Sequence, residues 1–143
     1  MKTPKRALGF TLIELLIAVV ILAIVSKLAY GAFSDIIRRS KMTTAFAIAA
    51  SYADLMERYY TTNNKYGSRA CGGTLPASVE DFSFSCVLGT GGQTFVATAT
   101  GSGPVDGYVY TIDQMGAKKT TKFNGVALSD PVPTCWWQEQ GQC

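Results

Sequence analysis

The sequence contains no histidine, no cysteine before Cys71, and little proline or glycine in its first half. Without imidazole, the Ser/His/Asp and Cys/His arrangements of hydrolases are excluded, as are zinc sites that need a histidine ligand. No proline occurs between residues 5 and 75, and Gly31 is the only glycine between residues 10 and 66. We therefore expect a protein that is not an enzyme and holds no cofactor or metal, with few helix breakers in its first half.

The charge of the chain is balanced once its first nine residues are set aside. There are 13 basic and 10 acidic side chains, which gives a formal net charge of +3. Lys2, Lys5 and Arg6 account for this excess. A nearly neutral body argues against a strongly electrostatic nucleic-acid binder, so any site for a polyanion must be a local basic patch.

A long apolar segment follows the basic start. Residues 10–25 have the sequence FTLIELLIAVVILAIV, and apolar character resumes after Lys27 as far as Phe33. Because roughly 20 apolar residues cross a bilayer, we predict a transmembrane helix at 10–33. An ordinary secretory signal peptide is the alternative, but it has no use for Glu14, since an ionisable group in an apolar helix is costly and normally has a partner.

The helical pattern continues beyond this segment. Apolar side chains recur at steps of three and four residues, the period of one helix face, at Ala45, Ile48, Ala49, Tyr52, Leu55, Met56 and Tyr59. One helix from Phe10 to about Tyr60 would be roughly 75 Å long. A small domain cannot cover such a helix, so its first half must be buried in lipid or in neighbouring copies.

The C-terminal half predicts an irregular loop and a small sheet. Residues 61–92 are rich in Gly, Ser, Thr and Asn and indicate a loop. Three short strands are predicted, at 93–100, 107–115 and 117–123. We expect one sheet face to lie on the helix, with Tyr108, Tyr110 and Ile112 packed against Ile48, Tyr52 and Leu55. The predicted fold class is therefore α+β, a long helix packed on a small antiparallel sheet.

The four cysteines, Cys71, Cys86, Cys135 and Cys143, all follow the membrane-type segment. An even number in that position indicates two disulfides formed in an oxidising compartment. Of the three possible pairings we favour Cys71 with Cys86 and Cys135 with Cys143, because each of these pairs brackets a separate flexible segment. A four-cysteine zinc site is the alternative, but the close paired spacings typical of such sites are absent.

Residues 9–15, GFTLIEL, resemble the processing site of type IV prepilins, with a short basic leader ahead of them. The resemblance implies that a prepilin peptidase cleaves between Gly9 and Phe10, usually with N-methylation of Phe10. Cleavage creates an ammonium group at Phe10, which then neutralises Glu14 in the same or a neighbouring subunit and so promotes assembly. The implied life cycle is a precursor in the inner membrane, then an extracellular filament built with other pilin subunits.

The rest of the chain resembles type IVa pilins, including a C-terminal disulfide-bounded region. This implies a leader at 1–9, a transmembrane and assembly helix at 10–33, and a globular head at 34–143. The expected function is a type IV pilus subunit, a minor pilin that supports pilus biogenesis, motility, adhesion or DNA uptake. A type II secretion pseudopilin shares the leader and helix and is the main alternative, but the two expected disulfides favour a filament exposed outside the cell.

The stretches YTIDQMGAKKTTKFNG and PTCWW resemble small minor pilins, including the group that contains DNA-uptake-sequence receptors. We expect Lys118 and Lys122 on one face of their strand, Lys119 on the other, and Trp136 and Trp137 nearby. Cations hold phosphates and flat rings stack on bases, so DNA is a candidate partner. In the alternative interpretation the lysines protect a sheet edge and the tryptophans pack under the disulfide-bounded loop.

Overall fold

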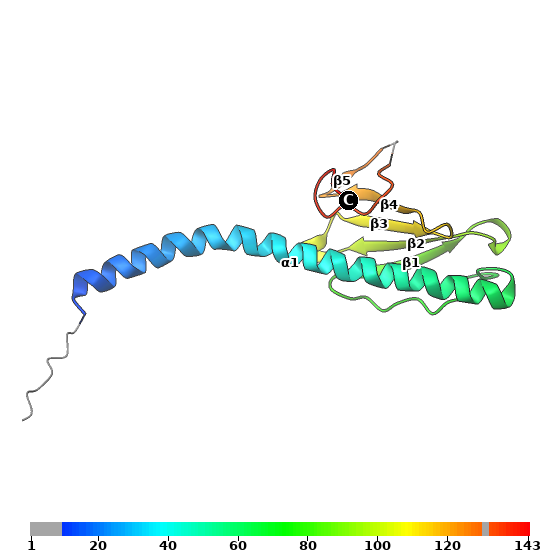
Figure 1. Ribbon diagram of the computed structural model, residues 1–143, viewed down its shortest axis with the longest axis horizontal. Coiled ribbons are helices and arrows are strands. Elements are labelled where there is room, and N and C mark those ends of the chain that lie inside the picture. Colours follow the sequence, from blue (N-terminus) through cyan, green and yellow to red (C-terminus); the bar gives the residue numbers. More distant parts are fainter. Residues whose placement is uncertain (1–9, 130–131) are drawn as a thin grey trace, which may run out of the picture. The chain divides into compact units, whose positions relative to one another are not determined.

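The computed structural model describes residues 10–129 and 132–143, except for the side chains of residues 28–32. Its regular elements are α1 (Leu12–Asn63), β1 (Phe82–Leu88), β2 (Phe95–Gly101), β3 (Val109–Asp113), β4 (Lys118–Phe123) and β5 (Val126–Ala127), with short 3-10 turns at Thr90–Gly92 and Gly103–Val105. Figure 1 shows the strands as one sheet beside the C-terminal half of α1. The predicted α+β class is confirmed, and Gly31 lies within the helix.

The chain divides into an N-terminal unit that ends at Ile36 and a C-terminal unit, Ile37–Cys143, which we call the head. In the N-terminal unit the apolar side chains between Phe10 and Val25 are exposed. Across residues 10–129 and 132–143, no helix is both long and apolar enough to cross a bilayer. The transmembrane segment predicted at 10–33 thus gains no support from the described residues and stays a prediction.

A reciprocal capping box begins α1. The Glu14 carboxylate accepts hydrogen bonds from the Thr11 backbone N–H at 3.1 Å and from the Thr11 hydroxyl at 3.0 Å. In return the Glu14 N–H donates to the Thr11 hydroxyl at 3.3 Å. This arrangement satisfies N–H groups that have no partner inside the helix. Glu14 therefore has a structural role at the helix start in addition to the assembly role inferred from the sequence.

The sheet contains five antiparallel strands in the order β1-β2-β3-β4-β5. The three predicted strands correspond to β2, β3 and β4. The prediction that residues 61–92 form only an irregular loop was wrong, because β1 lies within that range. Its sequence FSFSCVL alternates between inward and outward side chains, but the surrounding Gly, Ser and Thr hid the pattern.

The core of the head lies between α1 and the inner face of the sheet. Tyr108, Tyr110 and Ile112 are buried there, as predicted. The helix contributes Met42, Ala45, Ala49, Tyr52, Ala53 and Met56. Leu55 was expected in this core but is 39% exposed. The core-facing stripe is thus rotated away from Leu55 towards Ala49, Ala53 and Met56.

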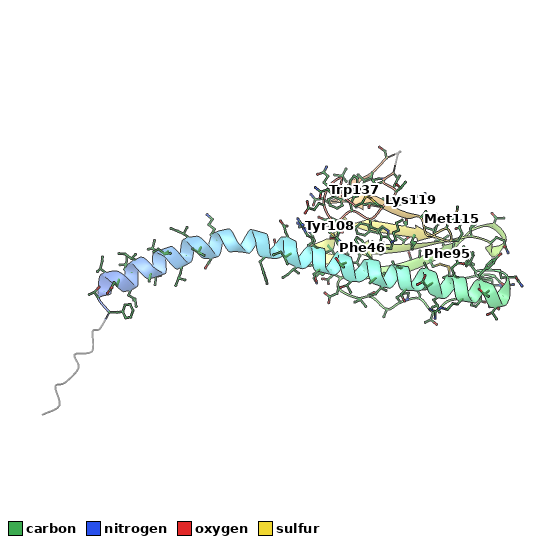
Figure 2. All side chains as sticks on the ribbon, in the orientation of Figure 1. Phe46, Phe95, Tyr108, Met115, Lys119 and Trp137 are labelled. Carbon is green, nitrogen blue, oxygen red and sulfur yellow. A yellow bond between two sulfur atoms is a disulfide. The ribbon has the colours of Figure 1, made fainter. Side chains whose placement is uncertain are left out.

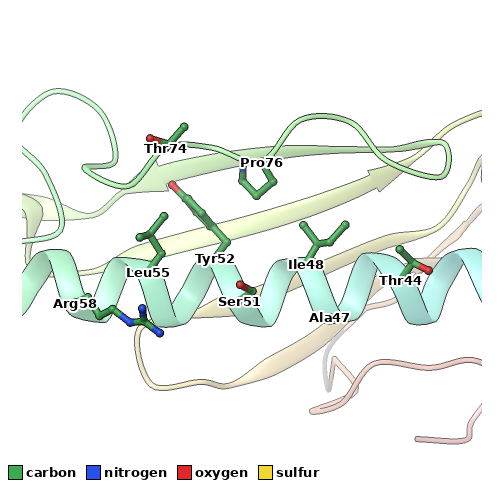
Figure 3. Close-up of a pocket in the computed structure, with 9 residues that line it drawn as sticks. All are labelled: Thr44, Ala47, Ile48, Ser51, Tyr52, Leu55, Arg58, Thr74 and Pro76. Carbon is green, nitrogen blue, oxygen red and sulfur yellow. The ribbon is translucent and has the colours of Figure 1, made fainter.

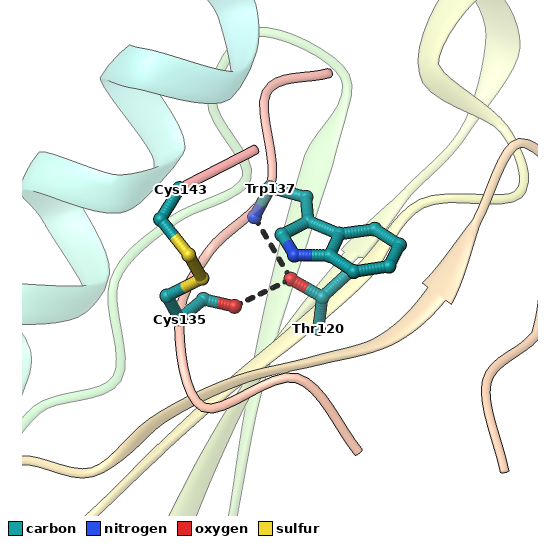
Figure 4. The surroundings of a disulfide bond; sticks show 4 residues. All are labelled: Thr120, Cys135, Trp137 and Cys143. Atoms are coloured by element: carbon teal, nitrogen blue, oxygen red, sulfur yellow. Dashed lines mark hydrogen bonds between the residues drawn. A yellow bond between two sulfur atoms is a disulfide. The ribbon is translucent and has the colours of Figure 1, made fainter. Parts of the chain in front are cut away.

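The C-terminal tail packs against the inner side of β4. Disulfides join Cys71 to Cys86 and Cys135 to Cys143, the two pairs expected from the sequence. Figure 4 shows how Thr120, a fully buried polar residue of β4, bonds to the loop that the second disulfide closes. Its hydroxyl donates to the Cys135 carbonyl at 2.7 Å and accepts from the Trp137 N–H at 2.9 Å. One side chain therefore satisfies two backbone groups of the tail.

Candidate functional site

A β-bulge in β4 decides which lysines share a face. Lys118 lies opposite Ile112 and Lys119 opposite Thr111, but the register shifts between Tyr110 and Val109, so that Lys122 lies opposite Val109. Directly paired residues share a face, and residues two apart on a strand do as well. Lys122 therefore lies with Lys119 on the outer face, and the predicted pairing of Lys118 with Lys122 was wrong. The extra residue is Thr121.

The outer face consists of ordered rows that cross the sheet. One row ends in Lys119 and is formed by Ser85, Thr98, Thr111 and Lys119. The next is formed by Ser83, Thr100, Val109 and Lys122 and continues to Ala127 of β5. We call these two rows the lysine rows. They combine hydroxyl groups with two cations, of which Lys119 is exposed and Lys122 is half-buried.

Lys118 belongs to a different environment. Its ammonium group lies 4.8 Å from the centre of the Trp136 ring, a cation–π contact on the inner side of β4. Trp136 itself is buried, stacks on Phe46 with ring centres 4.9 Å apart, and donates its ring N–H to the Thr111 carbonyl at 2.8 Å. Together with Phe46, Trp136 and Lys118 also line an open groove of about 460 Å³ beside the second disulfide. The contacts of the Trp136 ring agree with the alternative interpretation, in which the tryptophan packs beneath the tail, and a stacking role of Trp136 on bases stays a prediction.

Trp137 is half-buried and lies beside Phe123, with ring centres 5.7 Å apart. Its carbonyl accepts a hydrogen bond from the Tyr110 hydroxyl at 2.8 Å. These contacts fix the tail to the core, and Figure 2 shows Trp137 at the same end of the sheet as Tyr108. The two tryptophans therefore do not form one aromatic surface with Lys119 and Lys122.

Several other cations of the head are engaged by acidic or aromatic neighbours. Arg39 pairs with Glu139, and the Arg38 guanidinium lies 5.9 Å from the centre of the Tyr108 ring. Lys41 pairs with Asp81 and with Glu80, the latter at 3.5 Å. The hydrogen bond to Asp81 raises the pKa of Lys41. Lys119 and Lys122, by contrast, appear in none of the ion pairs found among the described residues.

A groove of about 480 Å³ lies between α1 and the segment that carries Thr74 and Pro76. Figure 3 shows Ile48 and Leu55 along its wall and the Tyr52 hydroxyl directed at that segment. Within the described residues this buried hydroxyl has no hydrogen-bond partner, and burial raises its pKa. None of the site residues predicted from the sequence lines the groove.

The predicted processing site lies at the start of the described chain. Gly9 is outside the described residues, so the Gly9–Phe10 bond stays a prediction. Phe10 is 86% exposed. The Glu14 carboxylate is held by Thr11, as described above, and the pattern T-x-x-E at residues 11–14 would have predicted this cap from the sequence.

The capped apolar helix, the antiparallel sheet and the disulfide-bounded tail are the features of a type IV pilin. Residues 4–26 match the prokaryotic N-terminal methylation motif. Residues 31–122 match the family described as type IV minor pilin ComP, DNA uptake sequence receptor. That match covers more than half of the chain, and the protein belongs to this family of pilus subunits. Pilins are structural proteins, and the match favours a pilus subunit over a secretion pseudopilin.

The chain is also similar in part to one curated protein and one solved structure. The chain is 32% identical over 93 residues to "Fimbrial protein EcpC" of Eikenella corrodens, a match that spans 64% of this chain and 61% of that protein. A solved type IV pilin from Shewanella oneidensis is 20% identical, with a TM-score of 0.49, over 57% of this chain and 89% of the other. The chain thus matches less than two thirds of the length of the fimbrial relative.

Proposed function

We propose that this pilin binds DNA through the two lysine rows on the outer face of its sheet. The family to which it belongs is described as containing DNA uptake sequence receptors. The observation that carries the proposal is the bulge at Thr121, which brings Lys119 and Lys122 to the same face. Phosphate oxygens accept hydrogen bonds from both ammonium and hydroxyl groups, so the rows match a sugar-phosphate backbone chemically.

The location on the sheet also fits a long, flat ligand. Rows that are two residues apart along a strand are separated by about 6.8 Å, so the two cations contact neighbouring positions on a nucleic-acid backbone. The hydroxyl groups of Thr98, Thr111 and Thr100 continue both rows across the sheet. With only two such lysines the electrostatic contribution is modest, which agrees with the near neutrality of the chain beyond its leader.

The test compares the double variant Lys119→Ala/Lys122→Ala with Lys118→Ala. The full chain, purified in detergent, is titrated with a labelled DNA duplex at several salt concentrations. Each phosphate contact contributes about 0.9 to the slope of log affinity against log salt, so the double variant should flatten the slope by about 1.8. Lys118→Ala should leave the slope unchanged, because this lysine lies over Trp136 on the other side of the strand.

An equal change of slope in Lys118→Ala would show that the outer face is not the phosphate site. An unchanged slope in the double variant would refute the proposed lysine rows even if the protein binds DNA. Wild-type protein that does not bind DNA at low salt would refute the DNA function itself.

We further propose that assembly begins with cleavage of the leader, residues 1–9, by a prepilin peptidase while the precursor is held in the inner membrane. The matched methylation motif and the basic leader support this proposal. The new amine of Phe10 then neutralises Glu14 of the same or a neighbouring subunit, which lets the apolar helix, residues 10–33, enter the filament. The globular region predicted at 34–143, which contains the head, remains on the filament surface, where DNA can reach its sheet.

Two variants separate the charge of Glu14 from its capping role. Glu14→Val removes both, whereas Thr11→Val removes only the hydroxyl that takes part in the capping box. We expect Glu14→Val to reduce recovery of the subunit in sheared filaments and Thr11→Val to have little effect. If both variants reduce recovery equally, helix capping rather than charge controls assembly. Mass spectrometry should find a mature chain that begins at methylated Phe10, and a start near Ala32 would contradict the cleavage site.

A further inference from the structure

The turn between β3 and β4 presents a large apolar side chain next to the lysine rows. Met115 is 83% exposed, and its side chain is one of the most exposed apolar groups of the head. Figure 2 shows it at the end of the hairpin, with Lys119 on the adjoining strand. A single exposed apolar side chain is common on protein surfaces, but Met115 differs in the turn that holds it and in the cations beside it.

The turn that carries Met115 is held by several hydrogen bonds. The Asp113 carboxylate accepts from the Met115 N–H at 2.9 Å and from the Ala117 N–H at 3.0 Å. The Gly116 N–H donates to the Asp113 carbonyl at 2.9 Å. Gly116 has φ of +71°, a conformation that favours glycine at the end of a tight hairpin loop. The backbone of Met115 is therefore held in place, so that only its side chain has to be ordered when it contacts a ligand.

The outer face next to the turn is apolar. Val87 lies opposite Val96, and Val96 lies opposite Asp113, so these residues form a row beside the one that ends in Lys119. Val87 is 67% exposed and Val96 is 42% exposed. The outer face thus has two neighbouring rows that contain a lysine. The next row, closest to the Met115 turn, contains Val87, Val96 and Asp113 instead.

The arrangement of the lysine rows and the valine row on the outer face restricts how a nucleic acid can lie on the sheet. Phosphates are attracted to Lys119 and Lys122, but the carboxylate of Asp113 and the two valines disfavour a phosphate on the last row. The part of the ligand that meets Met115 is therefore a sugar or a base edge. Proteins that insert methionine or other apolar side chains between base steps unstack the bases and bend the duplex.

We propose that Met115 is a wedge that inserts into bound DNA while Lys119 and Lys122 hold the phosphates. The inference rests on the proposed DNA function and adds a contact to the bases or sugars that the lysines do not supply. It also replaces Trp136, which the sequence had suggested for this contact and which is buried in the core.

The test uses the full chain in detergent and a DNA duplex that contains 2-aminopurine, a base whose fluorescence rises when it is unstacked. The variants are Met115→Ala, Met115→Leu and, as a control, Val126→Ala, which shortens another exposed apolar side chain. Wild-type protein should raise the fluorescence on binding. Met115→Ala should bind about tenfold more weakly, lose the fluorescence rise and keep the salt slope, because a wedge releases few counterions. Met115→Leu and Val126→Ala should behave like the wild type.

Unchanged affinity and fluorescence in Met115→Ala would overturn the wedge and leave the lysine rows as the site. A changed salt slope in Met115→Ala, or an equal loss in Met115→Leu, would also overturn it, since the turn would then act by positioning Lys119. If the wild type binds no DNA at low salt, the DNA function fails, and the wedge fails with it.

Discussion

The two faces of the sheet contrast sharply, although the same strands supply both. The inner face is aromatic and closed, with Phe82, Phe95 and Tyr110 almost fully buried against α1. The outer face has hydroxyl groups, three valines and the side chains of Lys119 and Lys122. The inner face supplies the stability of the head, and the outer face is free to vary for binding. Substitutions on the two faces should therefore have separable effects.

The largest effect should follow from opening the inner face. Phe82 is fully buried, whereas its neighbour Ser83 points outward. Phe82→Ala should lower the free energy of unfolding of the head by about 3–5 kcal/mol, because it removes a buried ring and leaves a cavity. Ser83→Ala should change it by less than about 0.5 kcal/mol. Urea denaturation followed by near-UV circular dichroism measures both, and equal effects would contradict the contrast between the faces.

Removal of the second disulfide should have the next largest effect. Cys135 and Cys143 close a loop with a sequence separation of 8. In the chain-entropy model the double variant Cys135→Ser/Cys143→Ser should lose about 2–3 kcal/mol of unfolding free energy. The same denaturation experiment applies, and the affinity for DNA should not change, because the loop packs on the inner side of β4. A loss of affinity without a loss of stability would mean that the tail itself contacts DNA.

Thr120→Val should cost about 1–3 kcal/mol of unfolding free energy, since it leaves the Cys135 carbonyl and the Trp137 N–H without their partner. Thr120→Ser keeps the hydroxyl and should recover most of this loss. The matched variant on the outer face is Thr98→Val, for which a near-neutral change is expected. If Thr98→Val costs as much as Thr120→Val, the hydroxyl groups of the outer face are structural and not available to a ligand.

The smallest effect concerns alkaline pH. Burial, together with the hydrogen bond that the Tyr66 hydroxyl donates to Glu57, raises the pKa of Tyr66 to about 12. The unfolded value is about 10, so the stabilisation is complete below about pH 10 and is lost as the pH rises through the folded pKa. Between about pH 9 and pH 11.5 the unfolding free energy of the wild type should fall more steeply than that of Tyr66→Phe. If the unfolding free energies of the wild type and Tyr66→Phe fall equally steeply with pH, the raised pKa of Tyr66 is contradicted.

Much of the fold was predictable because it depends on short-range patterns. Helical periodicity indicated α1, and the alternation of Tyr108, Tyr110 and Ile112 identified the inner face of β3. The cysteines were paired through the segments that they bracket. β1 was not predicted because the Gly, Ser and Thr residues around it have the composition of a loop, although its own side chains alternate. Leu55 was misplaced because a small rotation of the helix about its axis moves residues at the margin of the stripe out of the core.

The candidate site was less predictable, and the lysines of β4 show why. Strict alternation would put Lys118 and Lys122 on one face of the sheet. A single extra residue, Thr121, moves Lys122 to the opposite face, where Lys119 lies. A bulge depends on the register between two strands, which neither strand specifies alone. Similarly, an adjacent pair of tryptophans gives no sign that Trp136 fills a space between Phe46 and β4.

The sequence by itself determined the processing motif, the long helix, the disulfide pairs and the class of protein, because each depends on residues close together in the chain or on a recognisable pattern. Tertiary structure alone decided which lysines share the outer face, that Trp136 is buried and that Met115 is exposed beside Lys119. These properties depend on cross-strand register and on the path of the tail, where groups far apart in the chain compete for the same space.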